Sequence, residues 1–230
     1  MPKFGHYLVI LILAFLARSC TPVSIENNKR ILVDGRILGE DMQPLEGVEV
    51  RTATYVNRFL NRGIETLAKG TTNENGEVSF VSLDVNPGMI CLDIGRFPGT
   101  ENYQQIRICD SSSSRKANKF DLGDFQLRKQ AIVTLIVSLD QNLGYTLSFE
   151  DDYAQYEIED WNELSNFDNP DLVGEISELS GVFNSENIRD TLRFRTLQNS
   201  SFELLVRYPV NQEIYEFEVN QEENIYEIDL

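Results

Sequence analysis

The sequence predicts an all-β protein in which two antiparallel β-sandwich domains follow a cleaved N-terminal signal peptide in tandem. Short segments with alternating apolar and polar residues recur along the chain, as expected for half-buried strands. Turn sequences such as Asn75-Gly76 separate these segments and allow tight hairpins. Hydrophobic residues make up 41% of the chain, which is enough to build packed cores.

The N-terminus has the pattern of a bacterial export signal. Lys3 precedes an apolar run at residues 7–16, which is too short to span a bilayer and fits the apolar region of a signal peptide. The sequence Ala-Arg-Ser-Cys follows at residues 17–20. It resembles the lipobox of bacterial lipoproteins, with Arg18 in place of the usual small residue. This resemblance implies a diacylglycerol thioether on Cys20 and membrane attachment through acyl chains such as palmitate.

Cleavage before Cys20 would remove a signal peptide of residues 1–19 and leave residues 20–29 as a polar tether. The only histidine, His6, would leave with the signal. The mature chain would then have neither a Ser-His-Asp triad nor histidine ligands for zinc. We therefore expect a protein that is not an enzyme, with no catalytic residues, no metal and no cofactor. An ordinary cleaved signal and an uncleaved anchor are the alternatives to lipidation.

The chain is strongly acidic, with a formal net charge of -17. Such a surface repels nucleic acid and anionic lipid head groups, so we expect no nucleic-acid partner. Its simplest interpretation is solubility. The densest acidic stretch, residues 150–171, contains carboxylates of the kind that bind calcium. It has no EF-hand spacing, however, and a solvated acidic face is the alternative.

The first half of the chain predicts a β-sandwich over residues 30–128. Its alternating segments lie at residues 30–38, 48–56, 67–72, 77–83, 89–94, 105–109 and 119–127. Regularly spaced short strands with turn signals between them are typical of sandwiches.

Turn and core positions in this half carry a family resemblance. They are Val33 and Gly35, QPLEGVEV (43–50), TNENGEVSF (72–80), Pro87-Gly88 and LGDFQL (122–127). Together they resemble the carboxypeptidase regulatory-like domain, a transthyretin-like β-sandwich. The resemblance covers residues 30–128 and implies a non-catalytic accessory module, of a kind common in outer-membrane lipoproteins and receptors of the Bacteroidetes.

Cys91 and Cys109 lie in two neighbouring predicted strands. If these strands pair antiparallel with the cysteines opposite each other, Asp93 lies opposite Arg107, and the other face of the pair is aliphatic. A shift of one residue would destroy both matches. Because a bacterial envelope is oxidising enough for disulfides, we hypothesise a Cys91–Cys109 bridge. Two reduced thiols are the alternative.

The second half, residues 129–230, predicts another sandwich and resembles no family that we can name. Its strands are expected at residues 131–139, 143–149, 190–197, 202–208, 213–219 and 224–230. Residues 150–190 are acidic and irregular, with a strand or a short helix at 176–183. For residues 213–219, alternation does not decide which face is buried.

The tether and the accessory-type first domain favour a non-catalytic envelope lipoprotein that acts as a binding or assembly module for another envelope protein. We expect it in the outer membrane, facing the periplasm, with surface exposure as the alternative. A second hypothesis is glycan binding on an aromatic platform of Tyr153, Tyr156 and Trp161. The competing interpretation is that Trp161 packs into a core or seals a loop.

The intact mass of protein purified from its native membrane tests the anchor. We expect the mass of residues 20–230 plus lipid, with a further loss of two hydrogen atoms for the Cys91–Cys109 bridge. The mass of an uncleaved or unlipidated chain would contradict the predicted localisation.

Overall fold

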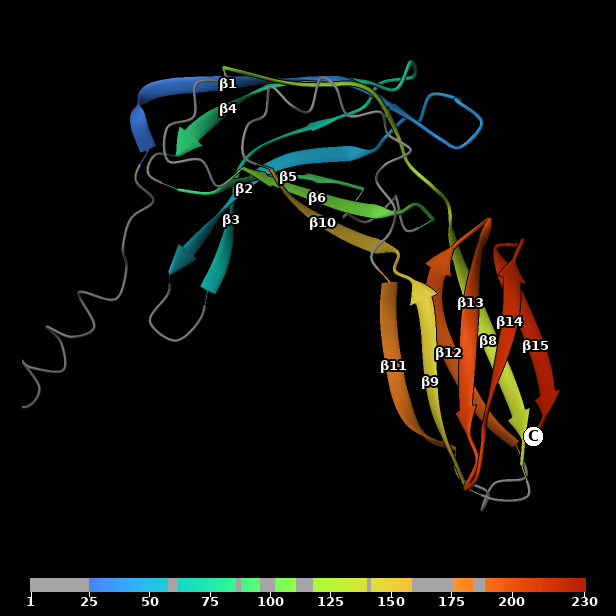
Figure 1. The fold of residues 1–230 in the computed structure, drawn as a ribbon. Helices are drawn as coiled ribbons and strands as arrows, with labels where there is room; N and C mark the ends of the chain where they lie inside the picture. The colour runs from blue at the N-terminus through green and yellow to red at the C-terminus, as the bar shows by residue number, and fades with distance from the viewer. Residues whose placement is uncertain are drawn as a thin grey trace, which may run out of the picture.

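The structure is a computed structural model that describes residues 25–57, 62–85, 88–95, 102–110, 118–139, 142–158, 176–183 and 189–230. These residues form fifteen strands and no helix, arranged as four sheets (Figure 1). The predicted all-β class is therefore confirmed. Within the described ranges there is also no helix with the length and hydrophobicity needed to cross a bilayer.

The first sandwich is built from eight strands in two facing sheets. The strands are β1 Ile25–Leu38, β2 Glu49–Asn57, β3 Arg62–Thr71, β4 Glu77–Val85, β5 Ile90–Ile94, β6 Gln105–Asp110, β7 Lys119–Gln126 and β10 Tyr153–Ile158. One sheet has the order β4-β1-β7 and the other β10-β6-β5-β2-β3. Ile31 and Phe120 from the first sheet share one buried core with Leu92 and Ile108 from the second.

The second sandwich contains the remaining strands, drawn in yellow to red in Figure 1. They are β8 Gln130–Ser138, β9 Leu143–Glu150, β11 Ile176–Phe183, β12 Arg189–Leu197, β13 Ser200–Arg207, β14 Gln212–Val219 and β15 Glu223–Asp229. Its sheets have the orders β11-β9-β13-β14 and β12-β8-β15. The core is rich in aromatic rings: Phe202 stacks on Phe217 at 4.7 Å between centroids and meets the edge of Phe194 at 5.2 Å.

The sequence predicts purely antiparallel sheets, and in this respect the prediction is wrong. Three neighbouring pairs run parallel: β1 with β7, β8 with β15, and β6 with β10. Parallel neighbours need a long connection that leaves the pair and returns. Between β1 and β7 the chain forms four of the five strands of the facing sheet, and between β8 and β15 it forms all four strands of the facing sheet.

Strand β10 was not predicted, because residues 150–190 were expected to be irregular. Its sequence nevertheless alternates, with Ala154 and Tyr156 opposite the core residues Ile106 and Ile108 of β6. Ala154 is fully buried, and Tyr156 packs against the first core. The sheet of the first sandwich therefore includes a strand that lies beyond residue 128 in the chain.

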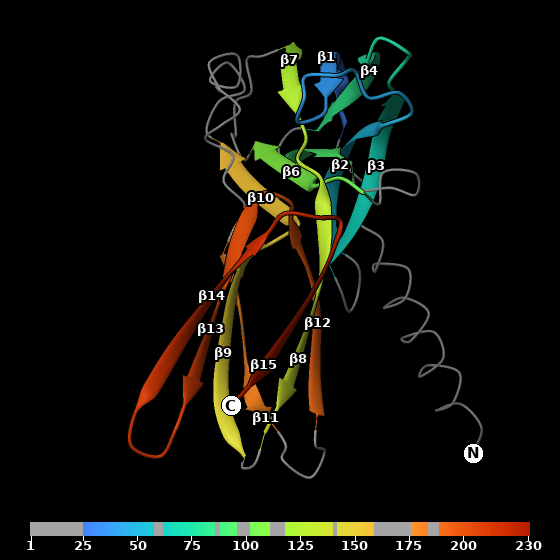
Figure 2. The ribbon, with the colours of Figure 1, turned by 90° about the vertical axis from the view of Figure 1, so that its right-hand side faces the viewer.

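The two sandwiches also meet at the connection between β7 and β8 (Figure 2). The Arg128 carbonyl accepts a hydrogen bond from the Gln104 N–H at 2.8 Å. The side chain of Glu40 accepts hydrogen bonds from the Lys129 N–H and from the amide of Asn199. One carboxylate of the first sandwich thus contacts both the connection and a hairpin of the second.

Strand β1 begins at Ile25, inside the segment expected to be a tether. A register irregularity separates the pair Ile25–Val85 from the pair Arg30–Leu83. Between them, the Lys29 ammonium lies 2.9 Å from the carboxylate of Asp84, whose side chain is fully buried. The ion pair gives a physical reason for the early start, since it neutralises a buried charge.

The substitution Ala154→Glu tests the assignment of β10 to the first sandwich. A carboxylate at this buried position would lie against Ile106, so we expect a loss of more than about 3 kcal/mol of unfolding free energy. Amide exchange in β6 should accelerate. As a control, Glu157→Ala changes an exposed residue of the same strand and should leave both quantities nearly unchanged. Unaltered protection of β6 in Ala154→Glu would contradict the pairing.

Candidate functional site

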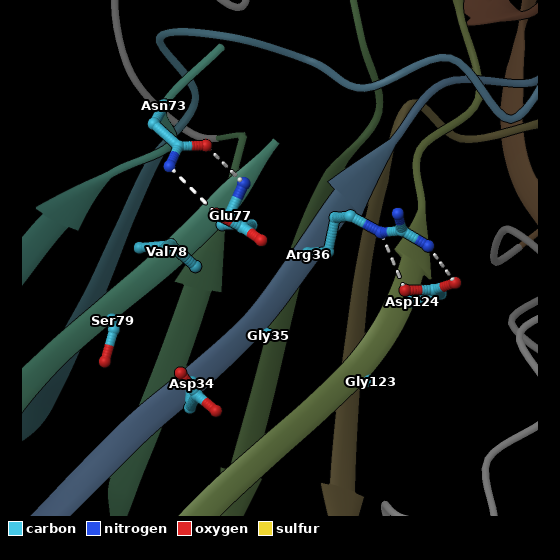
Figure 3. A pocket seen from close by; sticks show the side chains of 9 residues that line it. All are labelled: Asp34, Gly35, Arg36, Asn73, Glu77, Val78, Ser79, Gly123 and Asp124. Atoms are coloured by element: carbon cyan, nitrogen blue, oxygen red, sulfur yellow. Dashed lines mark hydrogen bonds and ion pairs between the residues drawn. The ribbon is translucent and has the colours of Figure 1, made fainter. Parts of the chain in front are cut away.

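One open depression lies on the outer face of the β4-β1-β7 sheet (Figure 3). Gly35 and Gly123 belong to its lining, and a Cβ on Gly35 would lie only 2.5 Å from the Cβ of the core residue Leu122, so this position does not accommodate a side chain. Its rim is polar and includes Arg36, Asp124 and Glu77.

The charged groups around the depression neutralise one another. Arg36 donates two hydrogen bonds to Asp124, at 2.9 and 2.5 Å, and these lower the pKa of that carboxyl. The Lys119 ammonium lies 2.8 Å from Asp121 and 3.2 Å from Asp34. Because these charges already have protein partners, the depression offers little to a charged ligand.

A second polar cluster lies on the face of β5 and β6 that points away from the core. The fully buried carboxylate of Asp93 accepts two hydrogen bonds from Arg107, at 2.5 and 2.8 Å, and one from Arg51 at 3.0 Å. The Arg107 guanidinium also lies over the ring of Tyr55, 5.8 Å from its centroid. Burial by itself lowers the pKa of Arg107, but the bonds and charge of Asp93 outweigh burial and raise it.

The two cysteines lie in the same pair of strands. In the register of β5 and β6, Cys91 is opposite Cys109 and Asp93 is opposite Arg107. A disulfide joins the two cysteines, and both are buried. The bridge and the ion pair are therefore consecutive cross-strand contacts on one face, where they hold the register and have no access to an external reactant.

The two described residues of the hypothetical glycan platform, Tyr153 and Tyr156, do not come together. Tyr156 packs against the first core, whereas the hydroxyl of Tyr153 donates to Gln155, on the opposite face of β10. The two tyrosines therefore share no surface. Trp161 and the lipidation candidate Cys20 lie outside the described residues.

The acidic stretch begins at the junction of the two sandwiches. Glu150 pairs with Arg128. Asp151 accepts hydrogen bonds from the Ser177 hydroxyl at 2.7 Å and from the Tyr153 N–H at 3.0 Å. Burial, and then hydrogen bonding to Asp151, raise the pKa of Asp152 to about 6. In the described part of the chain no three His, Cys, Asp or Glu side chains gather closely enough to hold a metal ion; residues 159–171 of the stretch lie outside it.

The outer face of the β11-β9-β13-β14 sheet differs from these sites, because it carries glutamates without an ionic partner among the residues that the structure describes. Glu203 of β13 lies directly opposite Glu216 of β14, and Glu178 of β11 lies in the same row, across Ser148. We call these three glutamates the acidic row. None of them forms an ion pair with another residue that the structure describes.

Aliphatic side chains flank the acidic row. Leu205 and Ile214 form the next cross-strand pair, and Ile214 is 60% exposed. At the other edge of the sheet, Ile176 and Val182 are each 66% exposed. Sequence reasoning missed this face because it could not assign the sides of β14. The core position of Phe217 settles that assignment, since alternation then turns Ile214 and Glu216 outward.

The comparisons with known proteins are distant. No protein-family model and no curated protein matches the chain. Among solved structures, the Bacillus anthracis TIE protein is 12% identical with a TM-score of 0.32, over 88% of this chain and 34% of that protein. The shaft pilin SpaA from Lactobacillus rhamnosus GG is 12% identical with a TM-score of 0.29, over 87% and 97% of the two chains.

A third neighbour, the 3-chlorocatechol 1,2-dioxygenase from Rhodococcus opacus 1CP, is 11% identical with a TM-score of 0.28, over 46% of this chain and 62% of that enzyme. The present chain thus spans about a third of the length of the TIE protein. These resemblances are compatible with β-sandwich domains, and scores this low bear on neither activity nor partners.

Comparison of Asp93→Ala with Asp124→Ala tests which arginine pair stabilises the fold. Removal of the buried Asp93 leaves the Arg107 charge without its partner, which typically costs about 3–5 kcal/mol. Removal of the exposed Asp124 should have a far smaller effect, because water replaces the lost contact. Urea unfolding of both variants measures the difference. Equal losses would show that burial does not set the strength of these pairs.

The raised pKa of Asp152 predicts that the stability of the fold depends on pH. An aspartate that is harder to ionise in the folded protein than in the unfolded chain, where the pKa is about 3.8, destabilises the fold once it is charged. This cost develops as the pH rises from about 3.8 to about 6 and is absent well below that window. Asp152→Asn should therefore raise the melting temperature at pH 8 by roughly 2–4 °C, for about 1 kcal/mol after solvent screening, and leave it nearly unchanged at about pH 3.

The exposed substitution Glu74→Gln serves as the control for Asp152→Asn, since it also removes one negative charge. A pH-independent rise in the Asp152→Asn variant would rule out titration of this carboxyl as the cause.

Proposed function

We propose that the chain is a non-catalytic, lipid-anchored envelope protein whose two sandwiches bind or assemble another envelope protein. The observation that supports this proposal best is the outer face of the β11-β9-β13-β14 sheet. It combines exposed aliphatic side chains with carboxylates that lack an ionic partner among the described residues, and such a combination is typical of protein-binding surfaces.

The other polar clusters give less support to a ligand-binding function. The depression on the first sandwich is lined by charges that pair with one another. The Asp93 cluster is buried and satisfied by two arginines. Both arrangements stabilise a fold, whereas the acidic row lacks an ionic partner in the described structure and so favours a role in contact with a partner.

The anchor and the domain type rest on the sequence. The lipobox-like segment before Cys20 motivates membrane attachment in the cell envelope, and the outer membrane is the location we propose. The likeness of residues 30–128 to carboxypeptidase regulatory-like domains motivates a scaffolding role for the first sandwich. Glycan binding gains no support from the described residues of the platform, because Tyr153 and Tyr156 face opposite ways.

Cross-linking in native membranes tests the proposal. We expect the wild-type protein to yield a defined cross-linked product with one envelope protein, identified by mass spectrometry. Cys20→Ala should release the chain from the membrane fraction and reduce that product, because the effective concentration of the partner falls. Wild-type protein that is recovered only as itself, or that binds purified envelope glycans, would contradict the proposed function.

A further inference from the structure

Among the strands that the structure describes, β14 is an edge strand. It is the outermost strand of its sheet, with β13 as its only hydrogen-bonded neighbour among the described strands. Figure 2 shows β14 at the margin of the second sandwich. Half of the backbone N–H and C=O groups of an edge strand have no strand to pair with. One of them is occupied here, because the Glu218 carbonyl accepts a hydrogen bond from the hydroxyl of Tyr226.

The side chains of β14 define what a strand laid along this edge would meet. Tyr215 and Phe217 point inward and form part of the rim of the second core. Ile214, Glu216 and Glu218 point outward and are exposed. An added strand would therefore need apolar residues on its inner side. On its outer side, an aliphatic residue would lie beside Ile214 and cations beside the glutamates.

Charge decides which kind of strand fits. The outward carboxylate of Glu216 already lies opposite Glu203, and like charges in directly opposed positions destabilise a sheet. A cationic side chain beside them would relieve that repulsion. The outer face offers one cation of its own in the described part, Arg207, whose guanidinium donates to Thr146 at 2.7 Å and lies in a different row.

The same charges exclude a second copy of this chain at this edge. Pairing β14 with the β14 of another molecule would bring together two strands that each carry Glu213, Glu216 and Glu218. The net charge of -17 adds long-range repulsion between copies. The edge is thus protected from self-association and remains open to a basic segment.

We propose that β14 is the docking edge for an extended basic segment of the partner protein. The segment adds to the sheet as a strand, with lysine or arginine over Glu203 and Glu216 and aliphatic residues beside Ile214 and along the rim of the core. This inference rests on the proposed binding function and specifies the surface and the chemistry of its partner. Strand addition supplies affinity through backbone hydrogen bonds and specificity through alternate side chains.

Synthetic peptides test the docking edge on the full-length protein by fluorescence anisotropy. The probe is a short labelled peptide in which lysine and valine alternate. One comparator has glutamate in place of lysine, and another keeps the lysines but carries N-methyl groups along the hydrogen-bonding edge. We expect the lysine peptide to bind and both comparators to fail, since one lacks the charge and the other the backbone donors.

Variants locate the binding site on the protein. The double substitution Glu203→Lys/Glu216→Lys should weaken binding of the lysine peptide by about tenfold, the change expected when two cross-strand charge pairs become repulsive. The control Glu46→Lys/Glu74→Lys makes the same change in net charge at exposed residues of the first sandwich and should keep wild-type affinity. Equal affinity of the two double variants, or undiminished binding of the N-methylated peptide, would overturn the proposal.

Cross-linking with these double variants distinguishes a failure of the docking edge from a failure of the binding function. Loss of the partner product in Glu203→Lys/Glu216→Lys but not in the control supports the docking edge. A product retained in both variants rejects this edge and leaves the binding function intact. A wild-type protein without any product contradicts the binding function itself, whereas the peptide affinities still report on the chemistry of the edge.

Discussion

The parallel pairing of β10 with β6 is the constraint on which the arrangement of the two sandwiches depends. The chain builds β8 and β9 in the second sandwich, returns to complete a sheet of the first with β10, and then goes back to β11. A hydrogen bond from the Gln105 N–H to the Asp152 carbonyl fixes the start of β10 beside β6. The first sandwich is therefore incomplete without a strand from the second half of the chain, so the two sandwiches differ from independent domains joined by a linker.

The polar contacts of β5 and β6 have a related role, because they make the register of the first sandwich unambiguous. The side chains of a strand alternate between its faces, so a slip by one residue would carry Asp93 into the aliphatic core and turn Ile94 outward. The bond from Arg107 to Asp93 and the neighbouring disulfide both oppose such a slip. The second sandwich relies instead on interlocking aromatic rings around Phe202.

Most of the strands could be predicted from residue patterns, because alternation and turn residues act locally. The pairing of β5 with β6 was accessible for the same reason, since charge and cysteine positions admit one register. Strand β10 was not recognised, because its alternation is short and its acidic flanks suggested irregular chain. Strand β10 pairs with the edge of β6, which is distant in the sequence, and local residue patterns do not predict such a pairing.

The candidate surface was harder to foresee than the fold. Residues 213–219 alternate tyrosine, phenylalanine and glutamate in a way that fits either face. The stacking of Phe217 on the buried Phe202 assigns Phe217 to the core side of β14. Unpaired carboxylates are likewise invisible in a sequence where acidic residues are abundant, because their lack of a partner is a property of the folded arrangement.

The parallel neighbours β1 and β7 also determine how the first sandwich would respond to mechanical load. Force applied between the start of β1 and the end of β7 pulls along the ladder that joins them, because the two strands run in the same direction and are drawn past each other. The hydrogen bonds from Leu32 to Leu38 then resist sliding together, whereas a hairpin pulled at its open end separates one pair at a time. The parallel pairing of β8 with β15 gives the second sandwich the same geometry. Load applied along the strands in this way would therefore meet its greatest resistance at the two parallel ladders.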